Sequence, residues 1–152
     1  MNLRISAEGL SLIKQFEGLK LHPYFDSSGI PTIGYGTCFY SDGTKVKIDD
    51  PSISEERATE LLAYAVMQKA DCINQLVMVD LNQNQFDALC SLVYNIGQGN
   101  FQTSTLLFLL NEGLYQAVSE QFIRWNMANH IVIQGLNNRR IAEAALFDKA
   151  VT

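Results

Sequence analysis

Apolar positions follow a helical period over most of the chain. From residue 54 onward they recur every three or four residues, as they do on one face of an α-helix. Ser54 suits the cap position of this pattern, and the helix that it begins is expected to reach about residue 79. The same spacing predicts further helices at residues 82–96, 103–112, 115–124 and 136–148.

A shorter helix is expected near the beginning of the chain, from Ser6 to Phe16 or Glu17. Ser6 is a suitable N-cap residue, and Ile13 and Phe16 recur at helical spacing. Gly18 is the residue type that most often follows the end of a helix. The carboxyl group of Glu17 is therefore expected at the C-terminal end of this helix.

Residues 20–50 have a different character. They contain two of the three prolines and several residues that favour strands. The segments Ser27-Ser28-Gly29 and Ser41-Asp42-Gly43 predict turns. We therefore expect a small antiparallel sheet at residues 23–47.

The change in pattern near Pro51 predicts a fold of the α+β class. A small β-rich N-terminal lobe is expected to be joined by the long helix to a larger, all-helical lobe. We expect a single domain over residues 1–152, because a chain of this length forms one core. Lobe 1 is expected at about residues 15–60, and lobe 2 at about residues 1–14 and 61–152. Two such lobes leave a cleft between them.

The charge of the chain argues against several classes of partner. The formal net charge is −5, and the eleven lysines and arginines form no cluster. No nucleic-acid partner is therefore expected, because such binding needs a basic surface. The apolar stretches fall far short of the roughly 20 residues of a membrane helix, so no membrane insertion is expected. No metal or nucleotide motif is present, and we expect no metal and no cofactor.

The cysteines and the N-terminus carry less information. Cys38, Cys72 and Cys90 form no metal-ligand spacing, and we interpret them as small buried apolar residues. A disulfide between Cys72 and Cys90 stays open. The N-terminus lacks a basic segment followed by an apolar one, so no signal peptide is expected. On this pattern the chain is made in the cytoplasm and leaves only with the help of another machine.

Two carboxyl groups and a hydroxyl near the N-terminus are the candidate catalytic groups. Glu17 lies beside Phe16, and apolar surroundings favour the protonated form of a carboxyl group. Asp26 lies at a strand edge beside a turn, where water keeps a carboxylate ionised. Two carboxyls in such different surroundings are typical of a general acid and a general base. Thr32 can place a hydroxyl beside Asp26, so that the two hold one water molecule.

Both acids also have an ordinary structural interpretation. A glutamate at a helix end, such as Glu17, is usually a solvated surface charge. An aspartate before Ser-Ser-Gly, such as Asp26, usually closes an Asx turn. The residue types and their spacing leave both interpretations open.

The spacing of Glu17, Asp26 and Thr32, followed by Ile33-Gly34-Tyr35-Gly36, resembles the catalytic segment of the phage-type lysozymes. These are the endolysins or muramidases of glycoside hydrolase family 24. The resemblance continues in family order over nearly the whole chain, through Gln85-Phe86-Asp87-Ala88-Leu89, Tyr94-Asn95-Ile96-Gly97, Arg124-Trp125 and Gly135-Leu136-Asn137-Asn138-Arg139-Arg140. It implies a lysozyme-like fold for the two lobes.

The resemblance also implies an activity. Members of this family hydrolyse the β-1,4 bond between N-acetylmuramic acid and N-acetylglucosamine in bacterial peptidoglycan, and so lyse cells. Glu17 matches the general acid, Asp26 the base or electrostatic partner that positions the attacking water, and Thr32 the residue that helps to hold this water. The family is expected to invert the anomeric centre, which requires carboxyl groups roughly 6.5–9.5 Å apart.

Further site residues follow from the same match. Arg139 corresponds to an arginine that family members place against the catalytic glutamate. The spacing itself is less decisive, because Arg139 and Glu143 lie four residues apart, as in a surface ion pair. Arg140 shares a face with Leu136 and is expected to point more inward.

The cleft is expected to have one wall from each lobe. Tyr94 and Asn95 match the cleft face of a helix in lobe 2, where an aromatic ring and an amide suit a sugar. Gly36 and Thr37 are expected to line the opposite wall. Many family members have histidine where this chain has Thr37, so an ion pair of that histidine is not expected here.

Three alternatives stay open on the sequence alone. One is a secreted antibacterial effector with the same activity, and another is a protein that binds peptidoglycan without catalysis. A lytic transglycosylase is a narrower alternative, against which Asp26 and Thr32 argue because they suit attack by water. The expected partner is the glycan strand of peptidoglycan, and a monomer is expected. A phage enzyme needs a holin, and an effector needs a secretion machine, to reach the wall in the periplasm.

Overall fold

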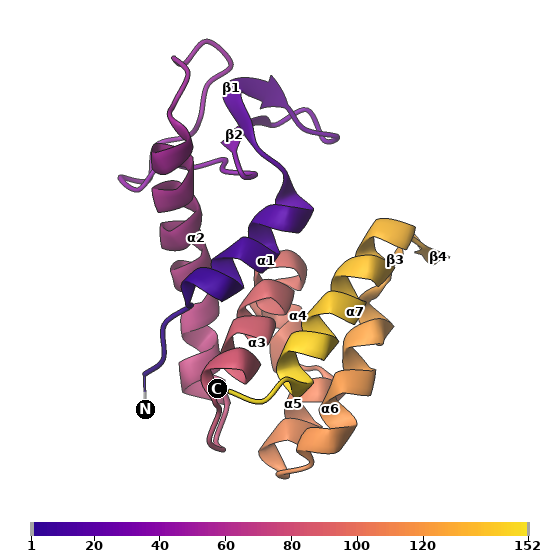
Figure 1. The fold of residues 1–152 in the computed structure, drawn as a ribbon. Coiled ribbons are helices and arrows are strands. Elements are labelled where there is room, and N and C mark those ends of the chain that lie inside the picture. The colour runs from indigo at the N-terminus through magenta and orange to yellow at the C-terminus, as the bar shows by residue number, and fades with distance from the viewer. Residues whose placement is uncertain (1, 152) are drawn as a thin grey trace.

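The computed structural model describes residues 2–151, which form a small sheet region and a larger group of helices (Figure 1). β1 (Lys20–Phe25) and β2 (Pro31–Gly34) lie at one end of the molecule. α2 (Glu55–Leu76) runs from this region into the helical part. The expected α+β architecture is confirmed, whereas the boundary between lobes at about residue 60 stays a prediction.

α1 (Ala7–Glu17) has the ends that the sequence predicts. The Ser6 side chain accepts a hydrogen bond from the backbone N–H of Gly9, and Gly18 ends the helix with a φ of 72°. Ser6 is in turn held by Asp87, whose Oδ1 accepts from the Ser6 backbone N–H at 3.0 Å and whose Oδ2 accepts from the Ser6 hydroxyl. The helix that presents Glu17 is therefore anchored at its opposite end.

The sheet is smaller than expected. β1 and β2 pair antiparallel, with Tyr24 opposite Thr32. Between β2 and α2 the chain forms isolated bridges instead of strands, and Ile33 and Thr37 exchange backbone hydrogen bonds of 2.9 and 2.8 Å. Gly36 lies inside this tight turn at a φ of 85°, a conformation that side-chain-bearing residues rarely adopt.

The helical part follows the predicted order with two additions. α2 ends at Leu76, earlier than expected, and a short helix, α4 (Gln98–Gln102), occupies the glycine cluster after α3 (Gln83–Ile96). A hairpin of β3 (Met127–Ala128) and β4 (Ile131–Val132) precedes the last helix and was not expected. The helices are α3 (Gln83–Ile96), α4 (Gln98–Gln102), α5 (Thr105–Asn111), α6 (Tyr115–Phe122) and α7 (Gln134–Asp148), with a 3-10 turn at Ile123–Trp125.

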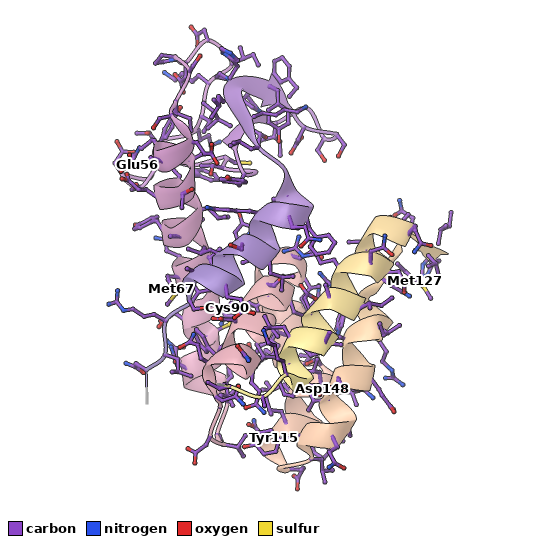
Figure 2. All side chains as sticks on the ribbon, in the orientation of Figure 1. Glu56, Met67, Cys90, Tyr115, Met127 and Asp148 are labelled. Atoms are coloured by element: carbon purple, nitrogen blue, oxygen red, sulfur yellow. The ribbon has the colours of Figure 1, made fainter. Side chains whose placement is uncertain are left out.

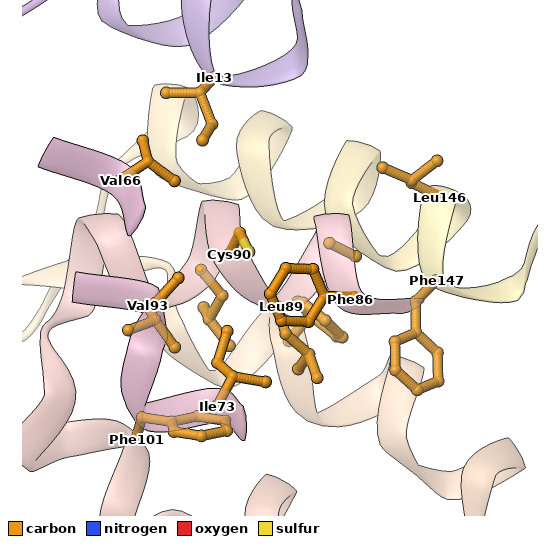
Figure 3. Packing of buried hydrophobic residues seen from close by; sticks show 14 of the residues in the cluster. Ile13, Val66, Ile73, Phe86, Leu89, Cys90, Val93, Phe101, Leu146 and Phe147 are labelled. Atoms are coloured by element: carbon orange, nitrogen blue, oxygen red, sulfur yellow. The ribbon is translucent and has the colours of Figure 1, made fainter. Parts of the chain in front are cut away.

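The core centres on α3, which packs against α1, α2 and α7. Figure 3 shows this packing from close by. Ile13 of α1 and Val66 of α2 meet one side of α3, and Phe147 of α7 meets another. Phe86 and Leu89 of α3 are fully buried between them. α1 and α7 are thus fixed against the same helix, which sets the relative positions of the residues that they carry.

Side chains away from this core are turned outward, as Glu56 and Met127 show in Figure 2. All three cysteines are free thiols. Cys72 and Cys90 are buried as expected, and burial raises the pKa of the Cys90 thiol. Cys38 is only half-buried, because it lies in the loop beside the cleft rather than in the core. None of the helices within residues 2–151 is long and apolar enough to cross a membrane.

Candidate active site

Glu17 is half-buried at the end of α1 and is held by an ion pair. Arg139 Nη1 donates to Glu17 Oε1 at 2.7 Å, and the Arg139 side chain is only 5% exposed. The other carboxylate oxygen, Oε2, faces Gly36, where an added Cβ would approach it to 3.1 Å. Glu17 therefore lies between α7 and the loop that follows β2.

Asp26 has the turn geometry of its ordinary structural interpretation. Its Oδ1 accepts from the backbone N–H groups of Ser28 at 2.8 Å and Ile30 at 2.9 Å, as in an Asx turn. Within residues 2–151, Oδ1 is the only carboxylate oxygen of Asp26 that accepts a hydrogen bond. The carboxylate is thus fixed through Oδ1, while Oδ2 remains available to a substrate or a water molecule.

Ile30 connects Asp26 with Thr32. Its backbone N–H binds Asp26, and its carbonyl accepts from Thr32 Oγ1 at 2.8 Å. Thr32 is 2% exposed and lies 3.7 Å from Cys38 Sγ. Because Thr32 donates its one proton to Ile30, its hydroxyl oxygen can act on a water molecule only as an acceptor.

Tyr24 lies in the electric field of both acids. Burial raises the pKa of its phenol, and the negative charges of Cys38, Glu17 and Asp26 raise it further. Opposite or like charges shift a pKa only when they lie near the group, so Tyr24 is a neighbour of each acid. The sequence analysis missed Tyr24, whose only signal was its place two residues before Asp26.

A cleft of about 420 Å³ lies between the sheet region and the helices. Gly36 and Thr37 line one side, and Tyr94 lines the other. Among the described lining residues Lys69 alone is charged, and its Nζ lies 4.6 Å from the centre of the Tyr94 ring. The complete lining is Gly36, Thr37, Cys38, Phe39, Tyr40, Ser41, Gly43, Tyr64, Ala65, Gln68, Lys69 and Tyr94. Aromatic rings in such a cleft suit the faces of sugar rings.

Asn95 lies outside the cleft in which it was expected, whereas Thr37 lines that cleft. Asn95 is exposed and lines a separate depression with Arg124 and Trp125 instead of the cleft of Tyr94, because consecutive helical residues point in different directions. Its Oδ1 accepts from Arg140 Nη2 at 2.9 Å. Thr37 lines the cleft, but its hydroxyl oxygen is buried and has no hydrogen-bond partner within residues 2–151.

Arg139 and Glu143 do not form the surface ion pair that their spacing suggested. Glu143 is fully buried and Arg139 is 4% exposed, because α3 covers this face of α7. Arg139 Nε donates to Glu143 Oε2 at 3.2 Å. Arg140 is also fully buried, as expected, and its Nε lies 2.8 Å from Glu143 Oε1.

The arrangement combines a half-buried carboxyl group, a second anchored carboxylate and a cleft. Glu17 can give a proton to a bound group and leave a carboxylate that Arg139 stabilises. Asp26 can accept a proton from a water molecule at Oδ2. Within residues 2–151 no cluster of three or more histidine, cysteine, aspartate or glutamate side chains is placed to hold a metal ion.

Comparisons with known proteins place this geometry in a family. The phage lysozyme family model matches residues 14–143, a range that includes Glu17, Asp26, Thr32 and Arg139. The chain belongs to the phage lysozyme family. The lysozyme-like fold predicted from the sequence is thereby confirmed.

Two phage endolysins are similar to this chain over nearly its whole length. The endolysin of Salmonella phage P22 is 43% identical, over 95% of this chain and 98% of that protein. The endolysin of Acyrthosiphon pisum secondary endosymbiont phage 1 is 41% identical, over 97% of this chain and 100% of that protein. Among solved structures, the endolysin from Escherichia coli O157:H7 phage FAHEc1 has a TM-score of 0.91 at 39% identity, covering 99% of this chain and 97% of its own.

Proposed function

We propose that this protein is a muramidase that hydrolyses the β-1,4 bond between N-acetylmuramic acid and N-acetylglucosamine in peptidoglycan, and thereby lyses bacterial cells. The activity is that of an endolysin from a phage or prophage. The observation that carries the proposal is the position of Glu17, which faces the cleft-lining Gly36 with one oxygen and is paired with Arg139 through the other.

Glu17 acts as the general acid in this proposal. Cleavage of the glycosidic bond requires a proton on the leaving oxygen, and a half-buried carboxyl group beside the cleft can supply it. The carboxylate that remains is stabilised by Arg139, whose guanidinium already lies at 2.7 Å. The same ion pair fixes the direction of the side chain before the substrate arrives.

Asp26 and Thr32 hold the attacking water. Asp26 takes the proton of this water at Oδ2, while its Oδ1 keeps the bonds to the turn. Thr32 offers a lone pair of its hydroxyl oxygen, because its proton is engaged by Ile30. Attack by a separate water molecule inverts the anomeric centre, so NMR of the first products should show the α-anomer of N-acetylmuramic acid. An initial excess of the β-anomer would instead indicate retention.

The substrate lies in the cleft between Gly36 and Tyr94. Gly36 allows the glycan to approach the backbone closely, and the ring of Tyr94 packs against a sugar face.

The same proposal includes a monomeric enzyme that reaches the cell wall through a holin pore or a secretion machine. The action on peptidoglycan is supported by the similarity to two endolysins over nearly the whole chain.

Release of reducing ends from purified peptidoglycan tests the proposal. Glu17→Gln keeps the size and the hydrogen bond to Arg139 but cannot give a proton, so the rate should fall about 10²- to 10⁴-fold. Glu60→Gln is the matched control, because Glu60 is exposed and, within residues 2–151, pairs with Arg57 alone on the surface of α2. Unchanged activity in Glu17→Gln would remove Glu17 from the mechanism. Tight binding to peptidoglycan without any reducing ends in the wild type would favour the non-catalytic alternative.

A further inference from the structure

Glu143 is a fully buried acid that lies behind the candidate active site and takes no part in the proposed reaction. It is on α7, and its side chain accepts hydrogen bonds at Oε2 from three donors. These are the hydroxyl of Ser91 on α3, Arg139 Nε at 3.2 Å and Arg140 Nη2 at 3.3 Å. Its other oxygen, Oε1, lies 2.8 Å from Arg140 Nε.

The contacts of Glu143 determine how Arg139 is oriented. The guanidinium of Arg139 is planar, so fixing two of its nitrogens fixes the third. Nε is held by Glu143, and Nη2 donates to the backbone carbonyl of Ser91 at 3.2 Å. The remaining nitrogen, Nη1, is then directed at Glu17, to which it donates at 2.7 Å.

Glu143 also balances charge inside the protein. Arg139 and Arg140 are 4% and 0% exposed, and a buried charge is costly unless it is paired. The pKa of Arg140 is lowered to about 10, mainly by burial; the charge of Glu143 opposes this shift, and that of the nearby Arg139 adds to it. Burial raises the pKa of the Glu143 carboxyl, and the two guanidiniums oppose that rise. Because Arg139 Nε and Arg140 Nε lie 3.2 and 2.8 Å from its two oxygens, the ionised Glu143 side chain offsets one of the two positive charges.

We infer that Glu143 is a positioning residue for catalysis, which aims Arg139 at Glu17 and limits the positive field at Glu17 by neutralising Arg140. The inference rests on the proposed role of Glu17 as the general acid. Without the charge of Glu143, the uncompensated Arg140 stabilises the ionised form of Glu17.

The other ionisable groups around this network are few. Glu17 and Arg139 both act on Tyr94 of α3, and Glu17 acts on Tyr24 of β1 together with Asp26 and Cys38. The nearest partners of Glu143 are the two arginines on its own helix and the neutral Ser91 on α3. Glu143 therefore lies behind Arg139 as seen from Glu17, because Arg139 contacts both acids.

The pH dependence of kcat and KM on one soluble peptidoglycan fragment tests the inference. In Glu143→Gln, the alkaline limb of the kcat profile should move to lower pH by about 0.5 unit or more, and kcat at its optimum should fall about tenfold with KM little changed. Arg140→Met removes the opposite charge and should move the limb to higher pH. A merely structural role changes the folded fraction without shifting the limb in opposite directions.

Glu143→Asp and Glu60→Gln complete the design. Glu143→Asp keeps the negative charge on a shorter side chain. The alkaline limb of its kcat profile should therefore stay near that of the wild type, while kcat falls. Glu60→Gln on the surface should change neither. If Glu143→Gln does not fold, Arg140→Met and Glu143→Asp still decide the outcome. The inference would be overturned if the alkaline limb coincided with that of the wild type in every folded charge variant. It would also be overturned if Glu143→Gln and Arg140→Met shifted the limb in the same direction. An inactive wild type or an active Glu17→Gln would overturn the proposed function instead.

Discussion

The two oxygens of Glu17 face different sides of the site. Arg139 holds Oε1, while Oε2 faces the turn at Gly36. The absence of a side chain at Gly36 leaves room for this oxygen and for the substrate. The geometry of a single glycine is thus coupled to the position of the proposed proton donor.

Gly36→Ala should impair catalysis more than stability. The new Cβ would lie 3.1 Å from Glu17 Oε2. The alanine would also have to adopt a φ of 85°. We expect kcat/KM to fall at least about tenfold through displacement of Glu17, and stability to fall by roughly 1 kcal/mol through backbone strain. Gly113→Ala is the matched control, because Gly113 has a φ of 78° and no atom within 4 Å of the added Cβ. Equal activity in the two variants would contradict a role for Gly36 in placing Glu17.

At the scale of elements, α1 is anchored at both of its ends. Asp87 binds Ser6 at its N-terminal end, and Arg139 binds Glu17 at its C-terminal end. Both anchors lie on helices of the core, Asp87 on α3 and Arg139 on α7. A shift of α1 across α3 therefore moves the carboxyl group of Glu17 relative to the cleft.

Gly9→Ala should destabilise the protein through the contact of α1 with α3. The added Cβ would lie 2.7 Å from both Asp87 Cγ and Ile5 Cγ1, so one of the neighbours must move. We expect a loss of about 1–3 kcal/mol in the free energy of unfolding, measured by urea denaturation. Gly135→Ala in α7 meets no atom within 4 Å and should stabilise by about 0.4–1 kcal/mol. A neutral Gly9→Ala would show that α1 is free to shift.

At the scale of the whole molecule, protonated tyrosines lie on both sides of the cleft. Burial raises the pKa of Tyr40 to about 12, with a further contribution from its hydrogen bond to Asp50. Burial also raises the pKa of Tyr24 in the sheet region and of Tyr94 on α3. The folded protein thus keeps protons that the unfolded chain loses near pH 10.

Stability should decrease as the pH rises from about 10 to about 12. In this range the native state binds more protons than the unfolded state, so the free energy of unfolding falls with pH. The contribution of Tyr40 is complete below about pH 10 and is lost on passing its folded pKa of about 12. Tyr40→Phe should flatten the decline in urea denaturation curves recorded across this range. An equally steep decline in Tyr40→Phe would show that Tyr40 is not its source.

Local signals made much of the fold predictable from the sequence. Ser6 and Gly18 mark the ends of α1 through contacts within a few residues, so Glu17 could be placed at a helix end. α4 and the β3–β4 hairpin were missed because their signals are weak. α4 lies among glycines, and the hairpin turns at Asn129 and His130, which adopt positive φ without being glycine.

Contacts in the site between residues far apart in the sequence were harder to predict. Arg139 and Glu17 are 122 residues apart in sequence, and only the resemblance to a family suggested their contact. The spacing of Arg139 and Glu143 is the same whether a helix face is exposed or buried, so their burial by α3 could not be deduced from it. The direction of Asn95 likewise depends on the rotation of α3 in the fold.

Mass spectrometry of the muropeptides released from purified peptidoglycan tests the catalytic roles of Glu17, Asp26 and Thr32 most directly. If Glu17 donates a proton while a water held by Asp26 and Thr32 attacks, the products end in hydrated, reducing N-acetylmuramic acid, and Glu17→Gln releases almost none. Products that end in an anhydro-sugar, lighter by one water molecule, would contradict this chemistry, because no external water would then have taken part in the reaction.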